Sequence, residues 1–197
     1  MDTQLSLLDS PSSGPDRYSL FLAIQPDRDT AECIHRLATD LKAAKGLTGT
    51  PRPLDHLHIT LHYFGHHSEI PEQTVQSIDY ACSQIAASTN PFDVKFGQVC
   101  GFQGSRAFVL AERGNANPAL AAFHQQLARG LTVHGIRILS HGRFNPHVTL
   151  LYPRNVVPPE PIDPIQWKVE EFVLIRSEEG KTKYEYLGRW KLAGDPT

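Results

Sequence analysis

The chain has 197 residues, of which 40% are hydrophobic and 20% charged, a composition typical of a globular domain with a sizeable core. The formal net charge of −2 excludes a general attraction to long nucleic acids, so any polyanion must be bound by a local patch. No apolar run reaches membrane-spanning length and no signal peptide is recognisable, so we expect a cytoplasmic protein that does not enter the membrane. Cys33, Cys82 and Cys100 are odd in number and widely spaced, which favours reduced thiols over a disulfide framework or a zinc site.

The first half of the chain predicts strands alternating with helices. Residues 1–16 are polar and rich in Ser, Pro and Gly, which is typical of a flexible tail. The apolar patterns and turn residues that follow predict a strand at 18–24, a helix from Asp27 to about Leu47, a strand at 57–64, and a helix from Pro71 with Val75, Ile78, Cys82 and Ile85 on one face.

The second half predicts mostly strands. We expect paired strands at 92–102 and 107–112, a helix capped by Asn117-Pro118 and running to about His134, a strand at 144–152, a proline-rich connector at 153–164, and closing strands at 167–175 and 183–192 around a turn at 178–181. Residues 193–197 form a C-terminal tail. The resulting order, β-α-β-α-β-β-α-β-β-β, is that of an α+β protein with one domain at 17–192.

The most informative feature is a four-residue pattern that occurs twice, as His58-Ile59-Thr60-Leu61 (the first motif) and as His147-Val148-Thr149-Leu150 (the second motif). Alternate side chains of a strand share a face, so each motif would present a histidine and a threonine on one side and anchor the other side in a core. A single His-x-Thr is a weak signal, but two copies with the same aliphatic neighbours in strand-like contexts are not.

This pair of motifs suits phosphoryl transfer. Two histidines facing one cleft can serve as general base and general acid near neutral pH, because the imidazole pKa is ordinarily about 6.5. The hydroxyls of Thr60 and Thr149 can donate hydrogen bonds to non-bridging phosphate oxygens. The chemistry needs no metal or other cofactor, and the sequence offers no carboxylate cluster for magnesium.

On these residues the chain resembles the two-histidine (2H) phosphoesterase superfamily, and within it the LigT-like 2′-5′ RNA ligase / RNA 2′,3′-cyclic phosphodiesterase family. The likeness covers about 17–192 and includes the strand 18–24, the segments 56–65 and 144–150, and the closing hairpin. It implies a bilobal fold in which two antiparallel sheets face a central cleft and helices lie outside. It also implies that His58 and His147 are the catalytic acid and base, and that Thr60 and Thr149 bind phosphate. The implied reaction is metal-free opening of a 2′,3′-cyclic phosphate to a 2′-phosphate, with reversible 2′-5′ RNA ligation in some members.

The sequence departs from the family at one place. Many relatives have an arginine two residues past the leucine of the second motif, where this chain has Tyr152. Arg106 or Arg143 could replace it, although exposed arginine is the default for either. We also consider Tyr152 and Phe144, which flank the second motif, as residues that stack a base.

Histidines crowd the segment 56–67, but Cys, Asp and Glu ligands at metal spacing are missing, which argues against a zinc site. Strand alternation places His62 on the face of Thr60, where it would contact the substrate or the rim of the cleft.

The tail contains Gln4-Leu5-Ser6-Leu7-Leu8, which resembles the short peptide that binds the bacterial sliding clamp; a slightly apolar tail without a partner is the alternative.

The sequence thus predicts a monomeric enzyme acting on RNA ends or 2′,3′-cyclic nucleotides. Two alternatives remain open: a nucleotide- or RNA-binding module without turnover, and a phosphodiesterase for another substrate, such as 2′-5′ oligoadenylate or a cyclic ADP-ribose phosphate.

Overall fold

The computed structural model describes residues 17–139, 143–178 and 183–193; the N-terminal tail with its Gln4–Leu8 peptide, most of the turn at 178–181 and all but the first residue of the C-terminal tail lie outside these ranges. The helices are α1 (Arg28–Ala44), α2 (Glu72–Ala87), α3 (Pro118–Val133) and a single 3₁₀ turn, η1 (Leu54–His56). The strands are β1 (Tyr18–Ile24), β2 (Ile59–His67), β3 (Phe92–Gly101), β4 (Phe108–Ala111), β5 (His147–Leu151), β6 (Glu160–Val169), β7 (Glu171–Glu178) and β8 (Tyr184–Lys191).

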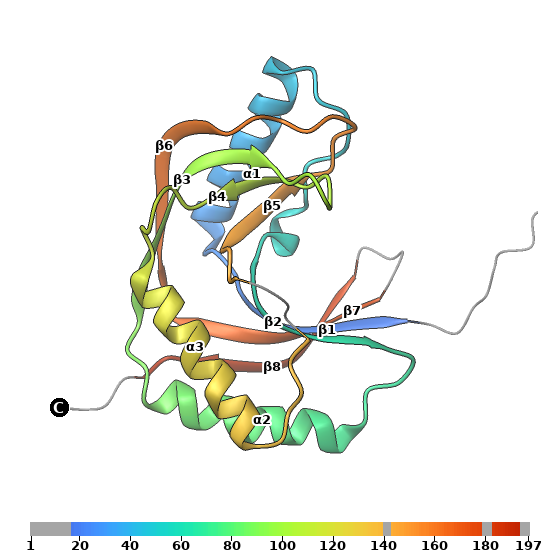
Figure 1. Cartoon of the computed structure of the whole chain (residues 1–197), viewed down its shortest axis with the longest axis vertical. Coiled ribbons are helices and arrows are strands. Elements are labelled where there is room, and N and C mark those ends of the chain that lie inside the picture. The colour runs from blue at the N-terminus through green and yellow to red at the C-terminus, as the bar shows by residue number, and fades with distance from the viewer. Residues whose placement is uncertain (1–16, 140–142, 179–182, 194–197) are drawn as a thin grey trace, which may run out of the picture.

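The strands form two four-stranded sheets in which all neighbours are antiparallel. Sheet A has the order β2-β1-β7-β8, and sheet B has the order β5-β4-β3-β6. Figure 1 shows sheet B above sheet A, with β6 and β7 carrying the chain from one to the other. The predicted α+β class with two antiparallel sheets is confirmed.

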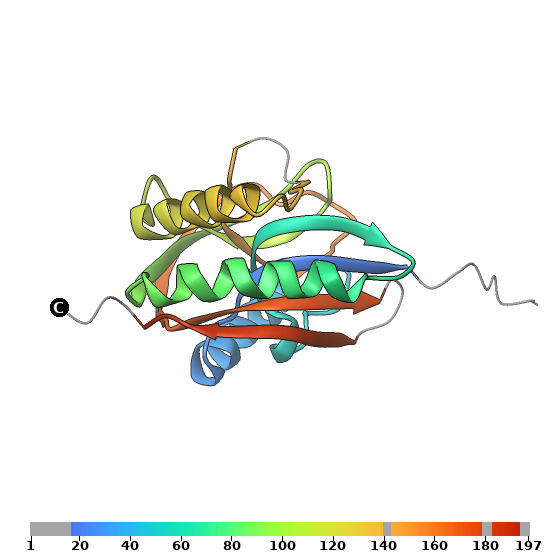
Figure 2. The same ribbon diagram turned by 90° about the horizontal axis from the view of Figure 1, so that it is seen from below.

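Each sheet is covered by helices on one face only. α1 leaves sheet A and packs on β5 and β6 of sheet B, whereas α3 leaves sheet B and packs beside α2 under sheet A (Figures 1 and 2). Asp27 starts α1 by accepting a hydrogen bond from the backbone N–H of Thr30 at 2.8 Å, and Ile34 and Ala38 bury the inner stripe of the helix. Among the described residues, no helix is both long and apolar enough to cross a membrane.

The main core runs through both sheets and all three long helices. The opposite, helix-free faces carry two smaller apolar clusters, which are Phe21, Ala23, Val173 and Ile175 on sheet A, and Cys100, Ala107, Val109 and Ala111 on sheet B. These clusters mark the two surfaces that the helices leave uncovered. The three cysteines are free thiols, as predicted.

The predicted proline-rich connector at 153–164 is wrong in its second part. β6 already begins at Glu160 and includes Pro161 and Pro164. It pairs only with β3, and an edge strand tolerates proline because one row of its N–H groups has no partner strand. The single strand predicted at 167–175 is likewise wrong, since the chain breaks at Glu170 and passes from β6 in sheet B to β7 in sheet A.

Asn117 precedes α3 as predicted, but its side chain does not cap the helix. Its amide instead accepts a hydrogen bond from the backbone N–H of Lys95 at 2.6 Å and donates one to the carbonyl of the same residue at 2.9 Å. Asn117 therefore ties the start of α3 to β3.

Candidate active site

The two motifs lie on the helix-free faces of the two sheets. Thr60 is paired with Ala23 in sheet A, and His58 directly precedes β2. In sheet B, Thr149 is paired with Val109, and His147 with Ala111. The paired residues belong to the helix-free clusters, so both histidine–threonine pairs lie on uncovered faces, as alternation along the strands predicts.

Both motif strands carry the same irregularity. The register of β2 shifts at Leu61, and that of β5 shifts at Leu150, so the leucine of each motif is the extra residue of a β-bulge. The residue after the bulge consequently points into the core on both strands: His62 opposite Leu22, and Leu151 opposite Phe108.

The prediction that His62 shares a face with Thr60 is therefore wrong, because the bulge interrupts the alternation. The His62 side chain is only 1% exposed, and its Nε2 donates a hydrogen bond to the carbonyl of His124 in α3 at 2.9 Å. Its ring also stacks on that of His124. His62 occupies a core position, the one that Leu151 fills in the second motif strand.

The imidazoles of the two motifs are oriented in the same way. Nδ1 of His58 lies 2.9 Å from the carbonyl oxygen of His56, and Nδ1 of His147 lies 2.8 Å from that of Asn145. A carbonyl oxygen only accepts hydrogen bonds, so Nδ1 carries the proton in both rings. In the neutral state each histidine therefore has its lone pair on Nε2, which leaves that atom able to accept a proton.

Aromatic rings support both histidines. His58 stacks on Phe21 with ring centroids 5.1 Å apart, and Phe102 meets His147 edge-on at 4.8 Å. Burial lowers the pKa of His147, against an opposing effect of its hydrogen bond to Asn145.

Burial, together with smaller effects of Arg52, His147 and His56, lowers the pKa of His58 to about 4, against an opposing effect of its hydrogen bond to the His56 carbonyl. Strands β2 and β5, which carry the two motifs in different sheets, lie against each other, and His147 acts electrostatically on His58.

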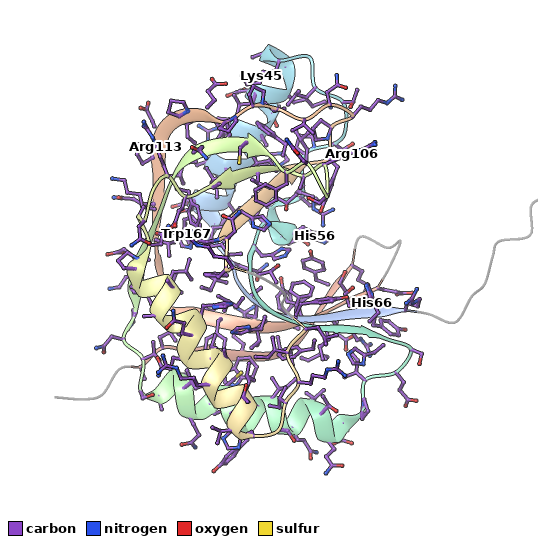
Figure 3. All side chains as sticks on the ribbon, in the orientation of Figure 1. Lys45, His56, His66, Arg106, Arg113 and Trp167 are labelled. Atoms are coloured by element: carbon purple, nitrogen blue, oxygen red, sulfur yellow. The ribbon has the colours of Figure 1, made fainter. Side chains whose placement is uncertain are left out.

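Three residues beside His58 were not identified from the sequence: Arg52, His56 and Tyr184. The ring of His56 lies flat on that of Tyr184, with centroids 4.0 Å apart, and Tyr184 meets His58 edge-on at 5.7 Å. Arg52 donates a hydrogen bond from Nη2 to Nδ1 of His56 at 3.1 Å. Burial raises the pKa of Tyr184, against an opposing effect of the Arg52 guanidinium. Figure 3 shows His56 between the two sheets. No short sequence pattern links these residues, because Tyr184 comes from β8 at the other end of the chain.

The other predicted substrate-binding residues are placed as follows. Tyr152 is 54% exposed just after β5. Phe144 stacks on His124 with centroids 3.9 Å apart and packs against the main core. Arg106 is exposed in the turn between β3 and β4 (Figure 3), and Arg143 is also exposed. No hydrogen bond, ion pair or ring contact within the described ranges joins either arginine to a motif.

Within the described part of the chain, no three His, Cys, Asp or Glu side chains are grouped so that they could hold a metal ion. The histidines of the segment 56–67 are spread over different surfaces: His56 and His58 lie beside Tyr184, whereas His62 lies in the core.

The model of the 2′-5′ RNA ligase superfamily matches residues 26–181 of this chain. Among solved structures, TT0787 of Thermus thermophilus is 24% identical with a TM-score of 0.73, over 90% of this chain and 99% of that one. LigT of E. coli in its apo form is 23% identical with a TM-score of 0.71, over 89% of this chain and 98% of LigT. LigT complexed with 3′-AMP gives 24% identity and a TM-score of 0.70 over the same shares. No curated protein sequence matches.

The family match spans most of the chain, and the solved structures share its two sheets and three helices. The chain belongs to the 2′-5′ RNA ligase superfamily of 2H phosphoesterases, with a LigT-like fold.

Proposed function

We propose that this protein is a metal-independent phosphodiesterase that opens 2′,3′-cyclic phosphate ends of RNA, or 2′,3′-cyclic nucleotides, to 2′-phosphates. One observation carries the proposal: two imidazoles on strands of separate sheets that lie against each other, each with Nδ1 bonded to a carbonyl and each followed by a threonine on the same face. The LigT complex with 3′-AMP supports a nucleotide as ligand.

In the proposed reaction, a water oxygen attacks phosphorus and the bond from phosphorus to O3′ breaks. One Nε2 takes the proton of the water, and the other donates a proton to the leaving O3′. Thr60 and Thr149 donate hydrogen bonds to the non-bridging oxygens, where negative charge builds up. Over the cycle, the product gains one water and the two histidines exchange protonation states, which solvent resets.

We assign His58 as the base and His147 as the acid. Arg52 lies on the side of His58 and disfavours its protonated form, and no described cation has a corresponding effect on His147. The phosphodiester charge of the substrate would lie between the two rings and act on both, so it would not remove the difference in pKa between His58 and His147.

The test is hydrolysis of a 2′,3′-cyclic mononucleotide with EDTA present, with the product identified by phosphorus NMR. We expect a nucleoside 2′-phosphate, and a loss of activity in both His58→Ala and His147→Ala. His134→Ala is the matched control, because His134 is an exposed histidine at the end of α3. Full activity in either motif variant would refute the mechanism, and tight product binding without turnover would identify a binding module instead. Parallel assays with 2′-5′ oligoadenylate and a cyclic ADP-ribose phosphate test the other substrates, and joining of cyclic-phosphate and 5′-hydroxyl RNA ends tests ligation.

A further inference from the structure

Arg52 is bonded beside both motifs, to Leu150 of the second motif through its backbone and to His56, two residues before His58, through its side chain. The backbone N–H of Arg52 donates a hydrogen bond of 2.8 Å to the carbonyl of Leu150 in the second motif. The carbonyl of Arg52 accepts a hydrogen bond from Nδ1 of His35 in α1 at 2.9 Å. The side chain of Arg52 donates a hydrogen bond to His56 of η1, and its positive charge acts on His58. The two backbone hydrogen bonds do not depend on the side chain, so the guanidinium extends from a fixed point of the main chain.

The guanidinium is bound by neutral partners only. A guanidinium has five N–H donors, and the hydrogen bond to His56 leaves donors available. Within the described ranges, no carboxylate lies at ion-pair distance from Arg52, although the other ion pairs of the same ranges each join an arginine or lysine to a glutamate. A half-buried arginine without a counter-ion has an unmet preference for an anion.

Its partners hold the guanidinium in one orientation. The ring of His56 is 3% exposed, lies parallel to Tyr184 within 3°, and turns Nδ1 toward Arg52. Because that nitrogen accepts the hydrogen bond, His56 is neutral, and burial together with the charge of Arg52 keeps its pKa low, against an opposing effect of Asp55. The stacked rings of His56 and Tyr184 therefore orient the guanidinium of Arg52 without neutralising its charge.

We propose that Arg52 binds the phosphate of the substrate at this site and that His56 and Tyr184 are positioning residues for its guanidinium. The inference rests on the proposed function for the identity of the substrate, but binding of a phosphate-bearing nucleotide tests it independently. The exposed Tyr152 lies two residues after Leu150, to which the backbone of Arg52 is bonded, and so borders the same place.

The experiment measures binding of a nucleoside 2′-monophosphate by calorimetry, and kcat and KM for the 2′,3′-cyclic mononucleotide, in Arg52→Gln and in the wild type. We expect about 10- to 100-fold weaker binding in Arg52→Gln and a similar rise in KM, because a charge-assisted hydrogen bond to the phosphate is lost. Arg36→Gln, at an exposed arginine of α1, is the control and should bind as the wild type does.

Two further variants separate binding from a structural role. Arg52→Lys keeps the charge but not the planar fork and should fall between the wild type and Arg52→Gln. The double variant Arg52→Gln/Tyr152→Arg returns a cation to the same place from β5 and should regain at least part of the lost affinity, which a purely structural role of Arg52 does not predict. If Arg52→Gln fails to fold, the comparison of Arg52→Lys with the wild type decides.

The pH profile supplies a third readout. The titratable groups facing His58 are His56, His147 and Tyr184, and Arg52 is the described cation beside it. Removal of this cation raises the pKa of His58, so the acidic limb of the profile should move to higher pH in Arg52→Gln and remain in place in Arg36→Gln.

The outcomes are distinguishable. Unchanged affinity and KM in Arg52→Gln, with activity in the wild type, would overturn the role of Arg52 and leave the proposed function intact. Arg52-dependent nucleotide binding by a wild type that hydrolyses none of the substrates would refute the proposed function and retain the anion site.

Discussion

The two motif strands share one backbone design but have different surroundings. Each has a histidine whose Nδ1 donates to the carbonyl two residues earlier, and each has a bulge at its leucine. Only the first motif has the additional group of Arg52, His56 and Tyr184 beside its histidine, as far as the described residues extend. The shared design leaves Nε2 of both histidines able to accept a proton, and the difference places a cation beside His58 only, as far as the described residues extend.

The largest expected effect comes from the histidines themselves. His58→Ala and His147→Ala should each lower kcat by about 10²- to 10⁴-fold, since each removes one proton-transfer group. The double variant should lose little more than the worse single variant, because the two act as a unit. Single-turnover assays measure this, and multiplicative losses would indicate that the histidines act independently.

The threonines test whether the bulged strands are functionally equivalent. Thr60→Val and Thr149→Val should each lower kcat/KM by about 10- to 100-fold, because a hydrogen bond to a charged phosphate contributes about 1.5–3 kcal/mol. Steady-state kinetics measure both. A loss confined to one variant would show that the phosphate sits against a single motif.

Substitution of the aromatic rings that contact the two histidines tests the cause of the low pKa of His58. Phe21→Leu exposes one face of the His58 ring, reduces its desolvation and should raise its pKa from about 4 toward 6.5. Phe102→Leu should leave the pKa of His58 unchanged, since Phe102 supports His147. Histidine ring NMR titrations of both variants measure this, and equal shifts of His58 would contradict the separate supports.

The smallest effect on activity is expected at His62, the position where the two strands differ behind the bulge. His62→Leu should stay within about twofold of wild-type kcat/KM, because this side chain lies in the core and not with the motifs. A decrease in kcat/KM of more than tenfold would indicate that His62 takes part in the active site.

The same variant should change the acid stability. Burial lowers the pKa of both His62 and His124 in the folded protein, that of His124 to about 4. Above pH 6.5 both are neutral in the folded and unfolded states. As the pH falls from 6.5 toward 4 the unfolded chain binds more protons, so the free energy of unfolding decreases by up to about 1.4 kcal/mol per pH unit and group. Urea denaturation at pH 7 and pH 5 should show a smaller decrease for His62→Leu than for the wild type.

Local patterns predicted most elements of the fold and the two motifs. Strand alternation was sufficient for His58 with Thr60 and for His147 with Thr149, because these pairs precede the bulges. It failed at His62, since a bulge depends on how a strand pairs with its neighbour and not on the strand alone. The prolines of β6 misled for a similar reason, because only the sheet order makes that strand an edge.

The surroundings of the histidines could not be predicted because they depend on contacts between distant segments. Tyr184 and Arg52 meet only when β8 and the segment before η1 lie against the same face. Neither residue has a sequence neighbour that marks it, and an isolated arginine is by default a surface residue.

The exchange of helices between the sheets has a consequence for motion. α1 follows β1 of sheet A in the chain but packs on sheet B, and α3 follows β4 of sheet B but packs under sheet A. Neither half of the molecule is therefore a continuous piece of chain with a core of its own. A hinge motion that separates the two halves would expose the apolar core that they share. Enzymes with separate domains can bend at a hinge without this cost. The spacing between the two imidazoles is therefore set when the chain folds, and in the proposed reaction the substrate would meet a preformed pair.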